Sequence, residues 1–231
     1  MSSSSLITGL RSPAPALLIA IRIIVFAACL APAVLLANDW FAMRLGANPI
    51  EAVTHATGDW ALRLLLITLA VTPLRRFTGL HWLIRLRRML GLFAFFYVSL
   101  HFAAYVWLDL YFDWQAIALD ILDRPFITVG FAAFVLMLPL AFTSTQAAMR
   151  RMGGRRWQAL HRSVYGIAIL AVVHYWWLVK ADIREPLIYA LILAALLGLR
   201  VWSREQERRR QLAAIPGTPV FRGKVIRIVP K

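Results

Sequence analysis

Long apolar runs alternate with short polar connections along the chain. A helix rises about 1.5 Å per residue, so about 20 apolar residues cross a hydrocarbon core about 30 Å thick. Six runs reach or approach that length: Pro15–Ala37, Gly58–Thr72, Met89–Leu108, Phe126–Thr143, Leu160–Val179 and Pro186–Trp202. The pattern predicts an all-α integral membrane protein in which six transmembrane helices form a bundle.

Two of these runs allow a second interpretation. Gly58–Thr72 is short and carries Arg63, which makes it the least typical span. Pro15–Ala37 follows a Ser- and Pro-rich start and resembles a signal peptide, which would be cleaved. Because its apolar stretch is about 20 residues long and a signal peptide needs only about 7–15, we interpret it as the first span.

Basic residues are concentrated in every second connection. They are Arg75, Arg76, Arg85, Arg87 and Arg88, then Arg150, Arg151, Arg155 and Arg156, and after the last run Arg204, Arg208, Arg209, Arg210, Arg222, Lys224, Arg227 and Lys231. Cytoplasmic connections carry such an excess, so we expect both termini in the cytoplasm and an even number of spans. The expected parts are a cytoplasmic N-terminal segment at residues 1–14, a transmembrane domain at 15–202 and a basic cytoplasmic tail at 203–231.

The composition agrees with a membrane protein. Of the 231 residues, 61% are hydrophobic and only 16% are charged, whereas soluble domains are about half apolar and about a quarter charged. The net charge of +15 would suit nucleic-acid binding, but the basic residues lie in clusters between apolar runs and not on one polar surface. No glycine-rich nucleotide motif is present, and the single cysteine, Cys29, allows no intrachain disulfide and no C-x-x-C-H haem attachment.

The candidate chemistry lies in the histidines. His55 and His81 fall in expected loops, whereas His101, His161 and His174 fall in expected spans. Ionisable side chains inside a membrane are costly and usually functional. These three are therefore the residues to explain.

His101 and His174 are predicted to lie at the same depth. His101 comes 12 residues after Met89, and His174 comes 13 residues after His161, so both lie roughly 18–20 Å from the cytoplasmic edge. Two imidazoles on facing helices can ligate one haem iron from both sides, and such an iron transfers electrons instead of binding oxygen. The alternative is a pair of hydrogen-bonded interhelical histidines.

His161 has no histidine at matching depth on the third run. Arg87 stands there instead, 14 residues before His101. Its guanidinium can pair with a haem propionate or a flavin phosphate, or it can serve only as a topology charge. Since one outer haem leaves the inner half of the bilayer without a carrier, we expect a second haem or a flavin near His161.

Several long motifs resemble one family. They are HATGDWALRLLLITLAVTPLRR, RLRRMLGLFAFFYVSLHFAAY, RPFITVG, LAFTSTQAAMRRMGGRRWQALHRSVY and VHYWWLVK, within about residues 47–202. They are similar to the MsrQ (formerly YedZ) family of the ferric-reductase-like transmembrane superfamily. The resemblance implies a haem-holding bundle in a bacterial inner membrane, with haem b, one or two per chain, and FMN. It matches the family's haem histidines to His101, His161 and His174, whereas His55 matches a family position without an assigned role.

The resemblance also implies partners. Electrons would come from the quinone pool or a cytoplasmic flavin reductase and pass to periplasmic MsrP, a molybdopterin subunit that reduces methionine sulfoxide in periplasmic proteins. The chain would then be an electron-transfer subunit and not the catalytic one. Two departures from the superfamily matter: the C-terminal flavin and nicotinamide domain is absent, and three histidines stand in place of four. A stand-alone metal or quinone reductase, and a haem-free transporter or assembly factor, stay open as alternatives.

Overall fold

The computed structural model describes residues 13–179 and 182–213. Most of the expected N-terminal segment, and the tail beyond residue 213 with Arg222, Lys224, Arg227 and Lys231, lie outside the described residues. The helices are α2 (Pro15–Phe41), α3 (Pro49–Thr78), η1 (His81–Arg85), α4 (Arg87–Ala103), the π-helix η2 (Ala104–Asp109), α5 (Trp114–Asp123), α6 (Pro125–Phe142), α7 (Gln146–Met152), α8 (Gly154–His161), α9 (Val164–Leu178) and α10 (Arg184–Ala213). Within these ranges no strand occurs, so the all-α prediction is confirmed there.

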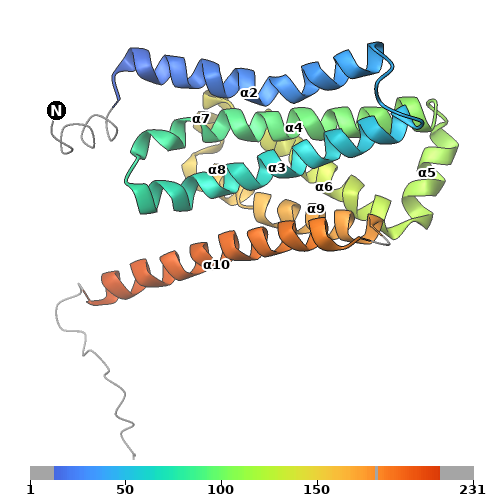
Figure 1. The fold of residues 1–231 in the computed structure, drawn as a ribbon. Coiled ribbons are helices and arrows are strands. Elements are labelled where there is room, and N and C mark those ends of the chain that lie inside the picture. The colour runs from blue at the N-terminus through green and yellow to red at the C-terminus, as the bar shows by residue number, and fades with distance from the viewer. Residues whose placement is uncertain (1–12, 180–181, 214–231) are drawn as a thin grey trace, which may run out of the picture.

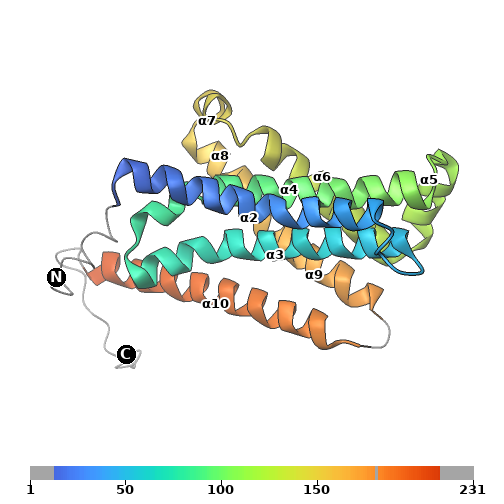
Figure 2. The same cartoon turned by 45° about the horizontal axis from the view of Figure 1, so that its top comes forward.

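Four helices form the centre of the bundle. α3 packs along α4, α6 packs along α9, and contacts of α4 with α6 and of α3 with α9 join the two pairs. α2 covers α3 and α4 from one side, and α10 covers α9 and α3 from another (Figure 1). α2 begins and α10 ends at the end of the bundle where α3 turns toward α4, whereas α5 lies at the opposite end (Figure 2).

The helices make this a multi-pass membrane protein. Five of the described helical segments are long and apolar enough to cross a membrane: Pro15–Phe41, Pro49–Thr78, Arg87–Asp109, Pro125–Phe142 and Arg184–Ala213. α9 is apolar but has only 15 residues. Large apolar side chains of α2 point away from the protein, such as Ile23 at 63% and Ile24 at 66% exposure. In a membrane these positions face lipid.

Two helices, α3 and α10, extend beyond their expected bounds. α3 begins at Pro49, nine residues before the expected start, so His55 lies on a helix and not in a loop. Asn48 explains the early start, because its side chain accepts a hydrogen bond from the Glu51 N–H and caps the helix. α10 continues to Ala213, so the first part of the expected tail is helical.

The expected fifth span, Leu160–Val179, is divided by a turn. α8 ends at His161 and α9 begins at Val164. Ser163 explains the division, because its hydroxyl and its N–H both donate to the Leu160 carbonyl. Such local bonds compete with the α-helical pattern and tighten the turn. His161 and His174 therefore stand on two helices, and the expectation of one continuous helix was wrong.

A tyrosine on α4 forms hydrogen bonds with backbone groups of α2 beside Pro32. Proline lacks an N–H and disturbs the preceding turn of a helix, and α2 bends midway along its length (Figure 1). The Tyr97 hydroxyl donates to the Cys29 carbonyl at 2.8 Å and accepts from the Ala33 N–H at 3.0 Å. These two groups pair with one another in an uninterrupted helix. Tyr97 is only 1% exposed. Its hydroxyl thus provides a hydrogen-bond partner for both backbone groups at a place that water does not reach.

Replacing Tyr97 with phenylalanine is expected to lower the free energy of unfolding by about 1–3 kcal/mol, because two buried backbone groups lose their partner. Thermal unfolding of the detergent-purified protein measures this effect. Tyr111→Phe is the matched control, since Tyr111 is 76% exposed. Equal unfolding temperatures for the two variants would show that the Tyr97 hydroxyl does not stabilise α2.

Candidate functional site

Two histidines in the bundle are each held by a hydrogen bond to a backbone carbonyl of a neighbouring helix. His101 on α4 donates its Nδ1–H to the Thr54 carbonyl of α3 at 2.8 Å. His174 on α9 donates its Nδ1–H to the Phe126 carbonyl of α6 at 2.7 Å. A carbonyl can only accept, so each Nδ1 must carry the proton. Each neutral ring therefore keeps the lone pair of Nε2 for a metal, and the carbonyl bond fixes the ring's orientation.

The two rings have the spacing that one shared metal ion requires. Their centres are 6.2 Å apart, and their planes cross at 78°. Two metal–imidazole bonds of about 2 Å each, with about 1.1 Å from each nitrogen to its ring centre, span about 6 Å. The pair therefore fits an iron bound from both sides. The structure brings His101 and His174 together, and their role as ligands stays a prediction.

Glycines make room for both rings. A Cβ atom on Gly58 of α3 would lie 3.1 Å from His101 Nδ1, and one on Gly130 of α6 would lie 2.7 Å from His174 Nδ1. Any larger residue at Gly130 would push the imidazole from its place. The two positions form a cradle in which each imidazole lies directly against the backbone of the neighbouring helix.

Both rings line one cavity of about 300 Å³ between α3, α4, α6 and α9. Its walls are largely apolar, with Leu62, Leu65, Phe102, Phe131, Phe134 and Met137 among them. Phe102 and Phe134 stack with ring centres 4.6 Å apart. His55 and Asp59 add polar groups to the lining. An apolar cavity with a few polar groups is typical of a cofactor site.

His161 lies apart from this pair. Its ring stacks on Trp157 with centres 3.9 Å apart, and its Nε2 lies 3.1 Å from Thr143 Oγ1. The Thr143 hydroxyl donates to the Pro139 carbonyl, so it accepts from His161 Nε2–H. Arg87 lies within electrostatic range of His161. The structure thus brings these two predicted residues near each other, but a metal at Nε2 would have to replace the Thr143 bond.

Arg63, the residue that made the second span doubtful, has partners inside the bundle. Its Nε donates to the Tyr189 hydroxyl of α10 at 2.9 Å, and its Nη2 lies 3.4 Å from Asp59 Oδ2. The guanidinium also lies 5.3 Å from the centre of the Trp60 ring. These contacts compensate the charge within the protein and join α3 to α10.

Comparisons with known proteins show which family the chain belongs to. Residues 57–172 match the family model described as ferric reductase like transmembrane component. Over 193 residues the chain is 57% identical to a protein of Azospira oryzae, with 83% of each chain covered. It is 56% identical over 210 residues to one of Xanthomonas campestris, covering 87% of this chain and 96% of the relative. Both relatives are named protein-methionine-sulfoxide reductase heme-binding subunit MsrQ.

The chain belongs to the MsrQ family. A third relative with the same name, from Herminiimonas arsenicoxydans, is 51% identical over 208 residues, covering 89% of this chain and 95% of its own. No solved structure matches the chain. The resemblance to MsrQ expected from the motifs is confirmed.

The sequence analysis missed four residues that contact the histidine pair: Thr54, Gly58, Phe126 and Gly130. Thr54 and Phe126 act through backbone carbonyls, which no side-chain pattern reveals. The glycines did leave a signal, because glycine is unfavourable inside an apolar helix unless something approaches its backbone closely. Gly130 closes the RPFITVG motif.

Proposed function

We propose that this MsrQ protein binds haem b between His101 and His174 and carries electrons across the membrane. The observation that supports it most is the pair of neutral imidazoles, 6.2 Å apart and each fixed through Nδ1 by a backbone carbonyl. The printed name of the relatives, a heme-binding subunit, agrees with it.

The surrounding residues prepare the site for fast electron transfer. His101 and His174 would hold the haem, which would supply one-electron redox chemistry with no position open for oxygen. The Thr54 and Phe126 carbonyls hold the rings in one orientation and would increase the basicity of the Nε2 atoms that would bind the iron. The apolar walls exclude water, which limits rearrangement of the surroundings when the charge of the site changes.

We further propose six spans with both termini in the cytoplasm of a bacterium, and residence in its inner membrane. Because α2 begins and α10 ends at the same end of the bundle (Figure 2), an even number of crossings is required. α9 would then be the sixth span beside the five longer ones. Its 15 residues reach roughly 22 Å.

The proposed electron path runs from the cytoplasmic end outward. A quinone or a cytoplasmic flavin reductase would supply electrons, and an inner cofactor, FMN or a second haem, would lie near His161 and Arg87. The Arg87 guanidinium near His161 supports an anionic group there. The acceptor would be MsrP, which agrees with the methionine-sulfoxide reductase system in the relatives' name.

Spectroscopy and a vesicle assay test this function. The purified protein is expected to show a Soret band, and α and β bands of low-spin haem b after reduction. In vesicles, a reductant outside is expected to reduce MsrP inside when the protein is present. Absence of a Soret band would favour a haem-free transporter. Equal rates with ferric chelates and with MsrP would favour a stand-alone metal reductase.

A further inference from the structure

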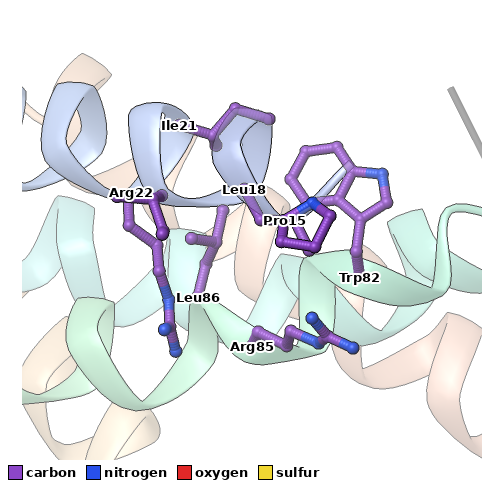
Figure 3. Close-up of a pocket in the computed structure, with 8 residues that line it drawn as sticks. Pro15, Leu18, Ile21, Arg22, Trp82, Arg85 and Leu86 are labelled. Atoms are coloured by element: carbon purple, nitrogen blue, oxygen red, sulfur yellow. The ribbon is translucent and has the colours of Figure 1, made fainter. Parts of the chain in front are cut away.

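A second pocket lies far from the histidine pair, between the start of α2 and the start of α4. It has a volume of about 220 Å³ and is lined by Pro15, Leu18, Ile19, Ile21, Arg22, Trp82, Arg85 and Leu86. Its walls are apolar except for two arginines, one from α2 and one from η1. Arg22 reaches from α2 toward α4 on one side of Leu86, and Arg85 lies on its other side (Figure 3). We call it the two-arginine groove.

Arg22 occupies an unusual position for a charged residue. It lies seven residues after Pro15, roughly 10 Å along a helix whose outer face is apolar and exposed. Its neighbours Ile19 and Ile23 are 58% and 63% exposed. An arginine at such a site is costly unless it reaches the headgroup layer or meets an opposite charge.

The protein does not supply that opposite charge within residues 13–179 and 182–213. Neither Arg22 nor Arg85 forms a hydrogen bond or ion pair with any described residue, although both are exposed. Arg63, another arginine inside a span, pairs with Asp59 and Tyr189. The contrast indicates that the partner of the two-arginine groove comes from the surroundings.

The surroundings at this level are lipid headgroups. The groove lies at the basic end of the bundle, next to the connection that carries Arg85, Arg87 and Arg88. Two guanidinium groups can share the oxygens of one phosphate, and apolar walls suit the first carbons of acyl chains. Basic pockets between membrane helices recognise anionic lipids in this way.

We propose that the two-arginine groove binds one anionic phospholipid, with its phosphate between Arg22 and Arg85 and an acyl chain along Leu18 and Ile21. The lipid would join α2 to the start of α4 at the basic end. This site does not include His101 or His174.

Native mass spectrometry of the full, haem-loaded protein tests the proposal. The protein is titrated with phosphatidylglycerol or with phosphatidylcholine of the same acyl chains. We expect one phosphatidylglycerol to be retained at energies that strip phosphatidylcholine. Arg22→Gln or Arg85→Gln is expected to weaken phosphatidylglycerol binding about fivefold, and the double variant about thirtyfold. Arg155→Gln, which removes an exposed arginine outside the groove, is expected to leave it unchanged.

Three results would overturn the proposal. The first is equal retention of both lipids by the unchanged protein, which needs no variant to fold. The second is loss of binding in Arg155→Gln as large as in Arg22→Gln. The third is displacement of phosphatidylglycerol by flavin mononucleotide at equal concentration, which would assign the groove to a free phosphate ligand. Circular dichroism of each variant confirms that its helices are intact.

Discussion

Alanine in place of either His101 or His174 is expected to lower the low-spin haem content of the purified protein more than tenfold. Each substitution would remove one of the two imidazoles that would hold the haem, whose ring centres lie 6.2 Å apart. Haem extraction and the reduced-minus-oxidised spectrum measure the loss. If an iron were held between the two rings in this crossed orientation, with their planes at 78°, the ferric protein should give a strongly anisotropic low-spin resonance.

Two other histidines complete this experiment. His81→Ala is the matched control, since His81 lies on η1, exposed and away from the cavity. It is expected to keep the full spectrum. His161→Ala is expected to keep the signal of the outer pair and to lose only what the inner cofactor contributes. Full low-spin haem in both His101→Ala and His174→Ala would contradict the shared iron.

Alanine at Gly130 is expected to weaken haem retention about 10- to 100-fold, although it adds a single carbon. The new Cβ would lie 2.7 Å from His174 Nδ1, so the imidazole must swing away and lose its bond to the Phe126 carbonyl. Removing such a supporting bond of a metal ligand typically has an effect of this size. Haem titration of the apoprotein, followed at the Soret band, gives the affinity.

Gly166→Ala is the matched control for this substitution. Gly166 lies on α9, the helix that carries His174, and no atom lies within 4 Å of an added Cβ. Because alanine favours a helix over glycine by about 1 kcal/mol, this variant should keep its haem and be slightly more stable. Unchanged haem affinity in a folded Gly130→Ala protein would show that the imidazole does not depend on the glycine.

Hydrophobic pattern and simple geometry predicted much of this molecule. The apolar runs located the long helices, because a bilayer fixes how many apolar residues a span requires. Counting depth from Met89 and His161 put His101 and His174 at one level, and their rings lie side by side in the structure. The depth predicted for His174 held although a turn divides the fifth run. Arg162 and Ser163 in this turn keep right-handed helical backbone angles, so the rise along the chain changes little.

Other features depend on tertiary contacts that a pattern does not contain. The Ser163 hydroxyl ended a helix inside an apolar run. Arg63 lowers the mean hydropathy of the second span. In the structure, its guanidinium donates a hydrogen bond to the Tyr189 hydroxyl, which comes 126 positions later in the chain. The neutral tautomer of each histidine follows from backbone carbonyls on neighbouring helices, and these become visible only when the helices are packed.

The two hydrogen bonds of the Tyr97 hydroxyl beside Pro32 have a consequence for membrane insertion. Chains enter a membrane from the N-terminus, so α2 is inserted while α4 is still unmade. Until α4 arrives, the Cys29 carbonyl and the Ala33 N–H lack the hydroxyl that satisfies both. The first span therefore reaches its final state only after the third has been inserted, and a nascent chain halted before Tyr97 would be the form most open to membrane proteases.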